Sequence, residues 1–314
     1  MLNLKDVKRE DKYLVVGLGE LLWDILPTGE QQLGGAPANF AYMTAMLGDR
    51  VAIASRVGDD PLGYEALGRL EQADVNITHV QQDATHPTGT ACVQLDDEGK
   101  PVYSIAEDVA WDHFELTPDW RELAAQADAV CFGSLAQRSP GSRETIRSFL
   151  KATRGESLIL FDVNLRRPFY SAGVLSESFM LSNIVKLNDE ELRTVAELLN
   201  LSRGTDEHSA RRLLQCFDLQ MVCVTRGDRG SLLVTESASV EHPGFKVDVA
   251  DTIGAGDAFS AALVHHHLRQ ASLDEINDAA NRLAALVATQ VGATPAAQQT
   301  LFGEFVARPS GGSS

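Results

Sequence analysis

The sequence predicts an α/β fold, in which a doubly wound and mostly parallel sheet is flanked by helices and carries a small β lid. Short apolar runs alternate with helical stretches of about ten residues, which is the pattern of βαβ units. One segment breaks this pattern. Two strand-like runs, residues 88–95 and 101–106, flank the turn residues Asp97-Glu98-Gly99, and no helix follows at once. A hairpin that projects from a parallel α/β body is typical of a lid.

The expected strands of the body are short and apolar, as strands covered on both faces are. In chain order they are residues 14–18, 51–56, 129–132, 158–161, 184–187, 221–225 and 231–235.

The expected helices lie between these strands, and several carry terminal signals. Pro37 lies in the first turn of the first helix and Gly48 follows its end, while Thr117-Pro118 provides a cap and a first-turn proline. The expected helices are residues 37–47, 62–73, 118–127, 143–151, 189–199, 209–217, 255–268 and 273–291.

The length of 314 residues fits either two domains or one large α/β domain. We see no internal repeat and no low-complexity linker, so a single domain with a lid fits better. We predict that domain over residues 1–309, with lid segments at about 19–35 and 88–109. The last residues, 310–314 (SGGSS), have the composition of a flexible tail.

The charge balance excludes two classes of partner. Forty-four acidic side chains against 27 basic ones give a net charge of −17. Non-specific nucleic-acid binding needs basic stripes that release counterions, and anionic membrane surfaces also attract basic segments. No apolar stretch approaches the ~18 residues of a membrane span. We therefore expect neither nucleic acid nor a membrane as a partner.

The cysteines indicate a reducing compartment. Cys92, Cys131, Cys216 and Cys223 form no C-x-x-C pair and have no histidine at zinc-finger spacing. Cys131 and Cys223 lie in apolar runs, so we expect buried free thiols. With an N-terminus that lacks an apolar signal region, this composition predicts a cytoplasmic protein.

Two familiar glycine motifs are absent. Gly17-Leu18-Gly19 follows a strand, but Leu22 stands where the dinucleotide fingerprint requires a third glycine. The Walker pattern and the signature runs of protein kinases are missing as well.

The strongest local signal is the segment from Asp251 to Phe259, DTIGAGDAF. Gly254 and Gly256 allow a ligand to approach the backbone, and a helix is expected to begin at Ala255. The free N–H groups and the dipole of a helix start form an anion site suited to phosphate. Asp257 lies in the first turn, where we expect its carboxylate to stay ionised and able to accept a hydroxyl proton. Taken alone, the segment could equally be a glycine-rich turn with an acidic helix start.

The whole chain resembles the ribokinase-like PfkB family of carbohydrate kinases. Asp251 to Asp257 matches the D-T-x-G-A-G-D signature of that family. Residues 33–39 (LGGAPAN), 47–48 and 57–63 (VGDDPLG) look like its N-terminal signature. The resemblance extends over about residues 14–296. It implies a doubly wound α/β body with a β lid over the sugar.

The resemblance implies roles for residues at the phosphoryl-transfer site. Asp257 corresponds to the base that deprotonates the sugar hydroxyl, and the amides of Gly254, Ala255, Gly256 and Asp257 hold the transferring group. Arg166, in the run D-x-N-x-R, is a candidate for charge stabilisation near the nucleotide phosphates or the substrate. The residues that correspond to the sugar site are Asp24, Gly34, Gly35 and Asn39.

The resemblance also implies an ATP site with metal ions. Asn188 and Glu191 correspond to an N-x-x-E element that places Mg²⁺ through water, although the same residues could simply cap a helix. Thr225 and Gly227 match the nucleotide loop. The remaining assignments follow from position alone: Asn281 near the adenine, and Asp251 with the backbone of Ile253 as ligands of a monovalent cation such as K⁺.

The run from Gly34 to Asn39, together with the run from Asp162 to Pro168, is more similar to fructokinases than to ribokinases. We therefore expect ATP-dependent phosphorylation of a terminal hydroxyl of a ketose such as fructose. A 2-keto-3-deoxygluconate kinase and a ribose or nucleoside kinase remain alternatives, and so does an inactive sugar-binding or scaffold protein. Lid strands of this family often pair between subunits, which implies a homodimer.

Overall fold

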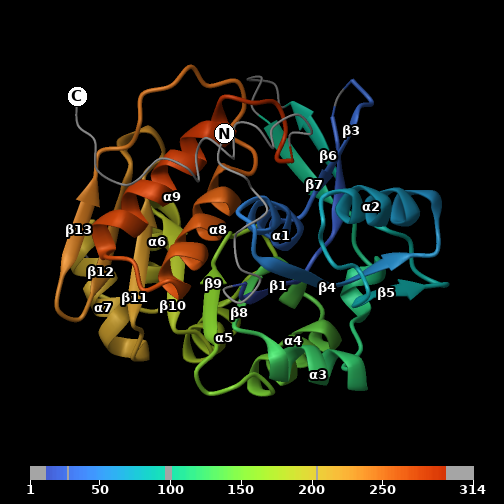
Figure 1. The fold of residues 1–314 in the computed structure, drawn as a ribbon, viewed down its shortest axis with the longest axis horizontal. Coiled ribbons are helices and arrows are strands. Elements are labelled where there is room, and N and C mark those ends of the chain that lie inside the picture. Colours follow the sequence, from blue (N-terminus) through green and yellow to red (C-terminus); the bar gives the residue numbers. More distant parts are fainter. Residues whose placement is uncertain (1–11, 27, 96–100, 203, 295–314) are drawn as a thin grey trace, which may run out of the picture.

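The computed structural model describes residues 12–26, 28–95, 101–202 and 204–294 (Figure 1). Three sequence features fall outside these residues, namely the N-terminal segment 1–11, the turn 97–99 and the tail 310–314.

The body is built on a sheet that has nine strands within the described residues. The spatial order of the strands is β13 (Ser239–His242), β12 (Ser231–Thr235), β11 (Met221–Thr225), β10 (Ile184–Asn188), β9 (Leu158–Asp162), β8 (Ala129–Gly133), β1 (Leu14–Leu18), β4 (Arg50–Gly58) and β5 (Val80–Asp83). In this order, neighbouring strands from β11 to β5 pair in parallel, whereas β12 and β13 extend one edge of the sheet in antiparallel fashion. The predicted parallel α/β body is thereby confirmed.

A smaller mixed sheet stands beside the body at the upper right of Figure 1. Its spatial order is β3 (Gln31–Gly34), β2 (Leu22–Ile25), β6 (Gly89–Leu95) and β7 (Pro101–Ile105). The pair β6–β7 is the antiparallel hairpin that the sequence predicts, and β2 joins it in parallel. The four strands of this small sheet lie within residues 19–35 and 88–109, the segments predicted to form a lid.

Two layers of helices cover the large sheet. One face packs against α1 (Ala36–Met46), α2 (Pro61–Gln72), α8 (Ala255–Leu268) and α9 (Leu273–Ala288). The other face packs against α3 (Pro118–Gln126), α4 (Pro140–Lys151), α5 (Ala172–Met180), α6 (Asp189–Leu198) and α7 (Asp206–Phe217). Strand side chains alternate between these layers, so Leu160 packs toward α8 and its neighbour Phe161 toward α5.

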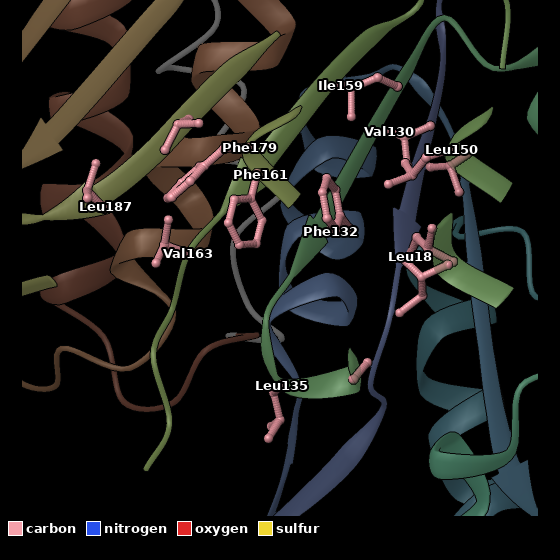
Figure 2. Packing of buried hydrophobic residues seen from close by; sticks show 14 of the residues in the cluster. Leu18, Val130, Phe132, Leu135, Leu150, Ile159, Phe161, Val163, Phe179 and Leu187 are labelled. Atoms are coloured by element: carbon pink, nitrogen blue, oxygen red, sulfur yellow. The ribbon is translucent and has the colours of Figure 1, made fainter. Parts of the chain in front are cut away.

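Aromatic rings fill the second layer. Phe161 of β9 stacks on Phe132 of β8 with ring centroids 4.9 Å apart, and meets Phe179 of α5 edge-on at 5.4 Å (Figure 2). All three rings are buried. Each such ring removes a large apolar area from water and fixes the spacing between helix and sheet.

Several element boundaries differ from the prediction. The helix expected at 143–151 begins at Pro140, and the helix expected at 209–217 begins at Asp206, because Ser139 and Thr205 precede them as N-caps. The last helix ends at Ala288 and not at residue 291. The sequence analysis also missed β2, β3, β5, β13 and α5.

The strand order of the sheet reverses between β1 and β8. Strands β4 and β5 are added on one side of β1, whereas β8 to β11 are added on the other. The carboxyl ends of the strands next to such a switch point form the usual ligand crevice of open α/β sheets. Glu20, Asp162, Asn188 and Thr225 lie at or just beyond these strand ends.

Among the residues that the structure describes, no helix has the length and apolar character needed to cross a membrane. Cys131 and Cys223 are buried, as predicted, and all four cysteines are free thiols.

Candidate active site

The first turn of α8 forms an open backbone cradle. Gly254 precedes it with φ of +79°, a conformation that glycine adopts without strain. A Cβ atom at this position would lie 2.7 Å from Ala293 Cα. Within the described part of the chain, the N–H groups of Gly254, Gly256 and Asp257 have no hydrogen-bond partner, and that of Ala255 has a long 3.3 Å contact with the Thr252 carbonyl. These donors can bind an anion.

Asp257 projects from this turn toward α1. Its Oδ2 accepts a hydrogen bond of 2.8 Å from the side-chain amide of Asn39, although 218 residues separate the two. Burial and the charge of Asp162 raise the pKa of Asp257 to about 7. The expectation that this carboxylate stays ionised is therefore wrong at and below about pH 7, because desolvation outweighs the effect of the helix start. A carboxyl that titrates near neutrality suits a general base.

A buried ion pair lies behind the cradle and was missed by the sequence analysis. Lys186 Nζ lies 3.0 Å from both carboxylate oxygens of Asp162, and the Ser260 hydroxyl donates to Asp162 Oδ2 at 2.8 Å. Burial lowers the pKa of Lys186, but the Asp162 charge outweighs this effect and raises it overall, so the ammonium stays charged. A Cβ atom on Gly256 would lie 2.9 Å from Lys186 Nζ, which places this cation directly behind the anion cradle.

Three of the predicted sugar residues belong to or adjoin the small sheet, since Asp24 lies on β2, Gly34 ends β3 and Gly35 follows it. Burial raises the pKa of Asp24 to about 6, while the charge of Arg166 opposes the rise. Gly34 leaves the space that Asp24 Oδ2 occupies, since any Cβ there would overlap the carboxylate. Gly35 has a φ of +100°, and a Cβ atom there would overlap the carbonyl oxygen of Glu20 in the same way. Both glycines are therefore required by close approach.

Glu20 joins this group, although the sequence analysis gave it no role. Its side chain is 2% exposed, and Oε2 has no hydrogen-bond partner among the described residues. Burial raises the pKa of Glu20 to about 7, with Arg166 opposing and Asp257 adding to the rise. An acid two residues after the end of β1 was the signal that could have identified it, because ligands bind beyond the carboxyl ends of such strands.

Arg166 is exposed on the loop after β9. Its charge acts on Glu20, Asp24 and Asp257. The structure thus puts Arg166 near the acidic group and open to solvent, where it can meet an anionic ligand.

Asp251 closes a loop with the segment after α9. Its Oδ1 accepts from the N–H of Ile253 at 3.0 Å, and its Oδ2 accepts from the N–H of Gly292 at 3.1 Å. The two predicted cation ligands, Asp251 and Ile253, are therefore in contact with each other, and Gly292 lies next to them. Its remaining lone pairs could contact a cation.

Asn188 and Glu191 form a capping box at the start of α6. Glu191 Oε2 accepts from the Asn188 N–H and Oε1 from the Leu165 N–H, each at 2.8 Å. Both oxygens are thus held by backbone donors. A carboxylate in this setting fits Mg²⁺ better through a water molecule than by direct contact, which agrees with the strong hydration of that ion.

A cavity of about 780 Å³ opens next to the cradle. The predicted nucleotide residues Asn188, Thr225, Gly227 and Asn281 all line it, together with Ala255 and Gly256 of the cradle. Asn281 is only partly available, because its amide donates to Ser231 Oγ at 2.6 Å and to the Asn277 carbonyl at 2.7 Å. Apolar side chains form another part of the wall, namely Val247, Val249, Phe259, Ala284, Ala285 and Ala288.

The geometry agrees with a comparison against protein families. Residues 24–300 match the family model described as pfkB family carbohydrate kinase. The chain belongs to the PfkB family. As a carbohydrate kinase of this family, it is a phosphotransferase that acts on a sugar hydroxyl.

Two curated PfkB relatives match most of the chain. The uncharacterized sugar kinase PH1459 of Pyrococcus horikoshii is 32% identical over 298 residues, which cover 89% of this chain and 91% of that protein. The fructokinase of Escherichia coli is 30% identical over 299 residues, covering 89% and 94%.

Solved structures agree with this assignment. The PH1459 sugar kinase in complex with ATP aligns with a TM-score of 0.78 and 31% identity, covering 90% of this chain and 94% of that one. A fructokinase of Vibrio cholerae bound to fructose, ADP and calcium aligns with a TM-score of 0.80 and 27% identity, covering 94% and 99%. The predicted family, the ribokinase-like fold and the similarity to fructokinases are thereby confirmed.

Proposed function

We propose that this PfkB member is an ATP-dependent kinase that phosphorylates a terminal hydroxyl of a ketose such as fructose. The observation that carries the proposal is the position of Asp257 between two features. On one side, Ala255 and Gly256 of the same helical turn line the large cavity. On the other side, the Asp257 carboxylate contacts Asn39 next to the acidic group of Glu20 and Asp24.

The transfer step needs little more than these groups. The ionised carboxylate of Asp257 takes the proton of the sugar hydroxyl, and the hydroxyl oxygen forms a bond to the γ-phosphorus of ATP. The bond from that phosphorus to the bridging oxygen breaks, and its electron pair leaves with ADP. The amides of Gly254, Ala255, Gly256 and Asp257 hold the transferring group, with Lys186 behind them as a fixed positive charge.

ATP as phosphoryl donor is supported by the shape and lining of the cavity. A volume of about 780 Å³ lies within the range of small-molecule sites. The apolar wall suits a flat base, and Thr225 and Gly227 offer polar groups next to it. The PH1459 relative has been crystallised with ATP.

Mg²⁺ would be held by Glu191 through water, with Asn188 fixing the position of that carboxylate. Bound there, the ion would neutralise charge on the phosphates. K⁺ is proposed at the loop of Asp251 and Ile253, next to the cradle.

Fructose is favoured as the substrate because named fructokinases are among the relatives at about 30% identity. Glu20, Asp24 and Asn39 offer oxygen acceptors and an amide donor, which suit an uncharged polyol. Arg166 at the edge of this group keeps 2-keto-3-deoxygluconate as the alternative, because its carboxylate would need a cation.

A panel of sugars with coupled detection of ADP tests the proposal. The panel contains fructose, 2-keto-3-deoxygluconate, ribose and a nucleoside, each with ATP and Mg²⁺ and with or without K⁺. We expect the highest kcat/KM for fructose and a higher rate with K⁺. A preference for the keto acid would contradict fructose as the substrate. If none of the sugars in the panel leads to ADP release, the result would favour the alternative of an inactive scaffold protein.

A homodimer through the lid is also proposed. Within the described residues, β3 and β7 are the outer strands of the small sheet, and outer strands have free backbone groups that pair readily. Light scattering at micromolar concentration that gives the mass of one chain would contradict it.

A further inference from the structure

Three side chains that can bind a metal meet at the base of the lid hairpin, and none of them belongs to the site described above. His86 precedes β6, Asp108 follows β7, and His113 ends the 3₁₀ turn η2 (Ala110–His113). One ligand atom from each lies within 4.8 Å of the others. Asp108 Oδ1 lies 2.9 Å from His113 Nε2 and 3.8 Å from His86 Nε2. Both imidazole nitrogens thus converge on one carboxylate oxygen.

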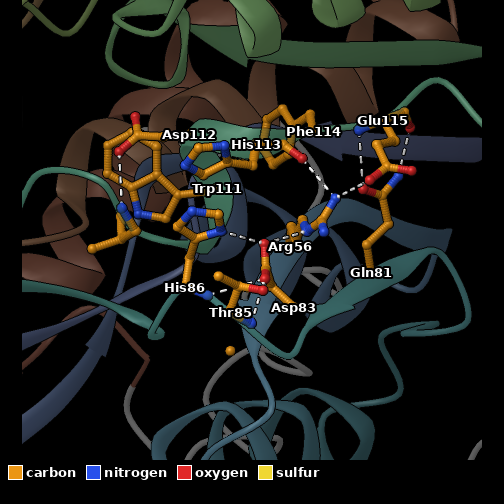
Figure 3. Close-up of polar contacts among 12 residues, drawn as sticks. Arg56, Gln81, Asp83, Thr85, His86, Trp111, Asp112, His113, Phe114 and Glu115 are labelled. Atoms are coloured by element: carbon orange, nitrogen blue, oxygen red, sulfur yellow. Dashed lines mark hydrogen bonds and ion pairs between the residues drawn. The ribbon is translucent and has the colours of Figure 1, made fainter.

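His86 is held from behind by a buried carboxylate. Asp83 Oδ2 lies 2.9 Å from His86 Nδ1, and Asp83 Oδ1 accepts from the N–H groups of Thr85 and His86 (Figure 3). Burial raises the pKa of Asp83, but the hydrogen bonds from His86 and Thr85 and the charge of Arg56 hold it well below its ordinary value. Because Nδ1 of His86 contacts Asp83, its other ring nitrogen, Nε2, is the one that faces Asp108. Ligating histidines typically have such a carboxylate partner.

Arg56 connects this partner to the second histidine. Its Nε lies 3.0 Å from Asp83 Oδ2, and its Nη1 donates to the carbonyl oxygen of His113 at 2.7 Å (Figure 3). Arg56 belongs to β4 of the body. The backbone of His113 and the Asp83 carboxylate behind His86 are therefore both held by Arg56 of strand β4.

The two imidazole rings stack on each other, with centroids 3.6 Å apart and an angle of 13° between their planes. In this stack the Nε2 atoms of both rings lie within 3.8 Å of Asp108 Oδ1. Neutral imidazoles are the form that binds metal ions.

We propose that His86, Asp108 and His113 bind a divalent transition-metal ion such as Zn²⁺. The ligand atoms are Nε2 of each histidine and one oxygen of Asp108, and water completes the coordination. Two nitrogens and one oxygen suit Zn²⁺, Co²⁺ or Ni²⁺, whereas Mg²⁺ and Ca²⁺ prefer oxygen ligands alone.

Binding requires one ring to turn, because a metal ion lies in the plane of each imidazole that binds it. The His113 side chain is 37% exposed and that of Asp108 80%, so these two can adjust while Asp83 holds His86. His86 lies three residues before β6 and Asp108 three residues after β7. An ion at this place would therefore tie both ends of the lid hairpin to the body.

Titration of the full chain tests the site without reference to kinase activity. The protein is freed of metal with a chelator and titrated at about pH 7.5, above the ordinary pKa of histidine. Zn²⁺ binding is followed by calorimetry, and Co²⁺ binding by its visible absorption. Cys216 is an exposed thiol that could bind either metal, so all variants carry Cys216→Ser.

We expect one tight equivalent, with affinity lowered at least about tenfold in His113→Gln and in Asp108→Asn. Asp83→Asn should weaken binding about 10- to 100-fold although Asp83 is not a ligand. His208→Gln, which changes an exposed histidine on α7, is the matched control and should bind as before. Equal affinity in the background protein, His113→Gln and Asp108→Asn would overturn the proposal, as would absence of binding. If Asp83→Asn does not fold, these two exposed variants decide.

Discussion

The side-chain amide of Asn39 on α1 donates a 2.8 Å hydrogen bond to Asp257 Oδ2 on α8. This bond stabilises the ionised form of Asp257 against burial and the charge of Asp162, which raise its pKa to about 7. The pH at which the proposed base becomes active is therefore set partly by a residue at the other end of the chain.

Asn39→Ala should move the acid limb of kcat/KM to higher pH. A general base works when ionised, so activity is lost as the pH falls through its pKa, and loss of the Asn39 donor raises that pKa above about 7. A pH profile of kcat/KM measures it. Thr44→Val is the control, because it removes a 2.8 Å hydrogen bond within the same helix without touching Asp257. An acid limb that stays in place in Asn39→Ala would show that the bond has no such effect.

Gly256→Ala should lower turnover by at least ~10²-fold, the usual effect of disturbing a preorganised oxyanion site. Its methyl group would lie 2.9 Å from Lys186 Nζ, and the ion pair with Asp162 prevents this ammonium from moving away. Gly141→Ala is the matched control. Gly141 is also the second residue of a helix, but a Cβ there lies 3.9 Å from its nearest neighbour. Steady-state kinetics of both variants decide the question, and equal turnover would contradict the tight fit.

Lys186→Met should destabilise the fold by about 3–5 kcal/mol, because it leaves the buried charge of Asp162 unpaired. Urea unfolding of the variant measures the loss. The control Arg193→Ala removes one of the two exposed arginine partners of Asp189 and should cost at most about 1 kcal/mol. Adding Asp162→Asn to Lys186→Met should restore part of the stability. Similar losses in Lys186→Met and Arg193→Ala would be inconsistent with a buried pair.

Glu20→Gln should change how stability depends on pH. The folded-state pKa of Glu20, about 7, lies above its ordinary value of 4.5. Its contribution to the free energy of unfolding is therefore fully present below about pH 4.5 and is lost as the pH rises through about 7. The variant lacks this titrating group and shows no such loss. Its free energy of unfolding should therefore rise relative to that of the wild type by about 3 kcal/mol across this pH range.

Urea unfolding at several pH values follows the Glu20→Gln difference. The exposed Glu190→Gln serves as the control for replacing a carboxyl group by an amide. A constant offset for Glu20→Gln would mean that this carboxyl titrates normally.

Local patterns in the sequence were enough to predict where α8 begins, whereas the assignment of its first turn to an anion site also needed the family resemblance. Gly254 just before an apolar helix and Gly256 in its first turn indicate a helix start with free amides, and α8 begins at Ala255 as expected. The family resemblance then assigned Asp24 and Asn39 to the same site. What it could not provide was the pKa of Asp257, because this depends on burial by segments distant in sequence.

The ion pair of Lys186 and Asp162 could be predicted only with knowledge of the strand order. The two residues are paired in register on neighbouring strands β10 and β9, a relation that neither local segment specifies. One signal was present, since a lysine in the apolar run IVKL of a buried strand requires a partner.

Strands β2 and β3 were missed for another reason. Each has only four residues, and Gln31 and Gln32 interrupt the apolar pattern of β3.

The turnover of Asp257→Asn tests the central claim most directly. The substitution keeps the shape of the side chain and removes the base. Asp119→Asn, an exposed acid in the first turn of α3, serves as control. We predict that kcat with ATP and the preferred sugar falls by at least ~10²-fold in Asp257→Asn, with sugar binding by calorimetry largely kept. Turnover close to that of the wild type would contradict the assignment of Asp257 as the base and the mechanism built on it.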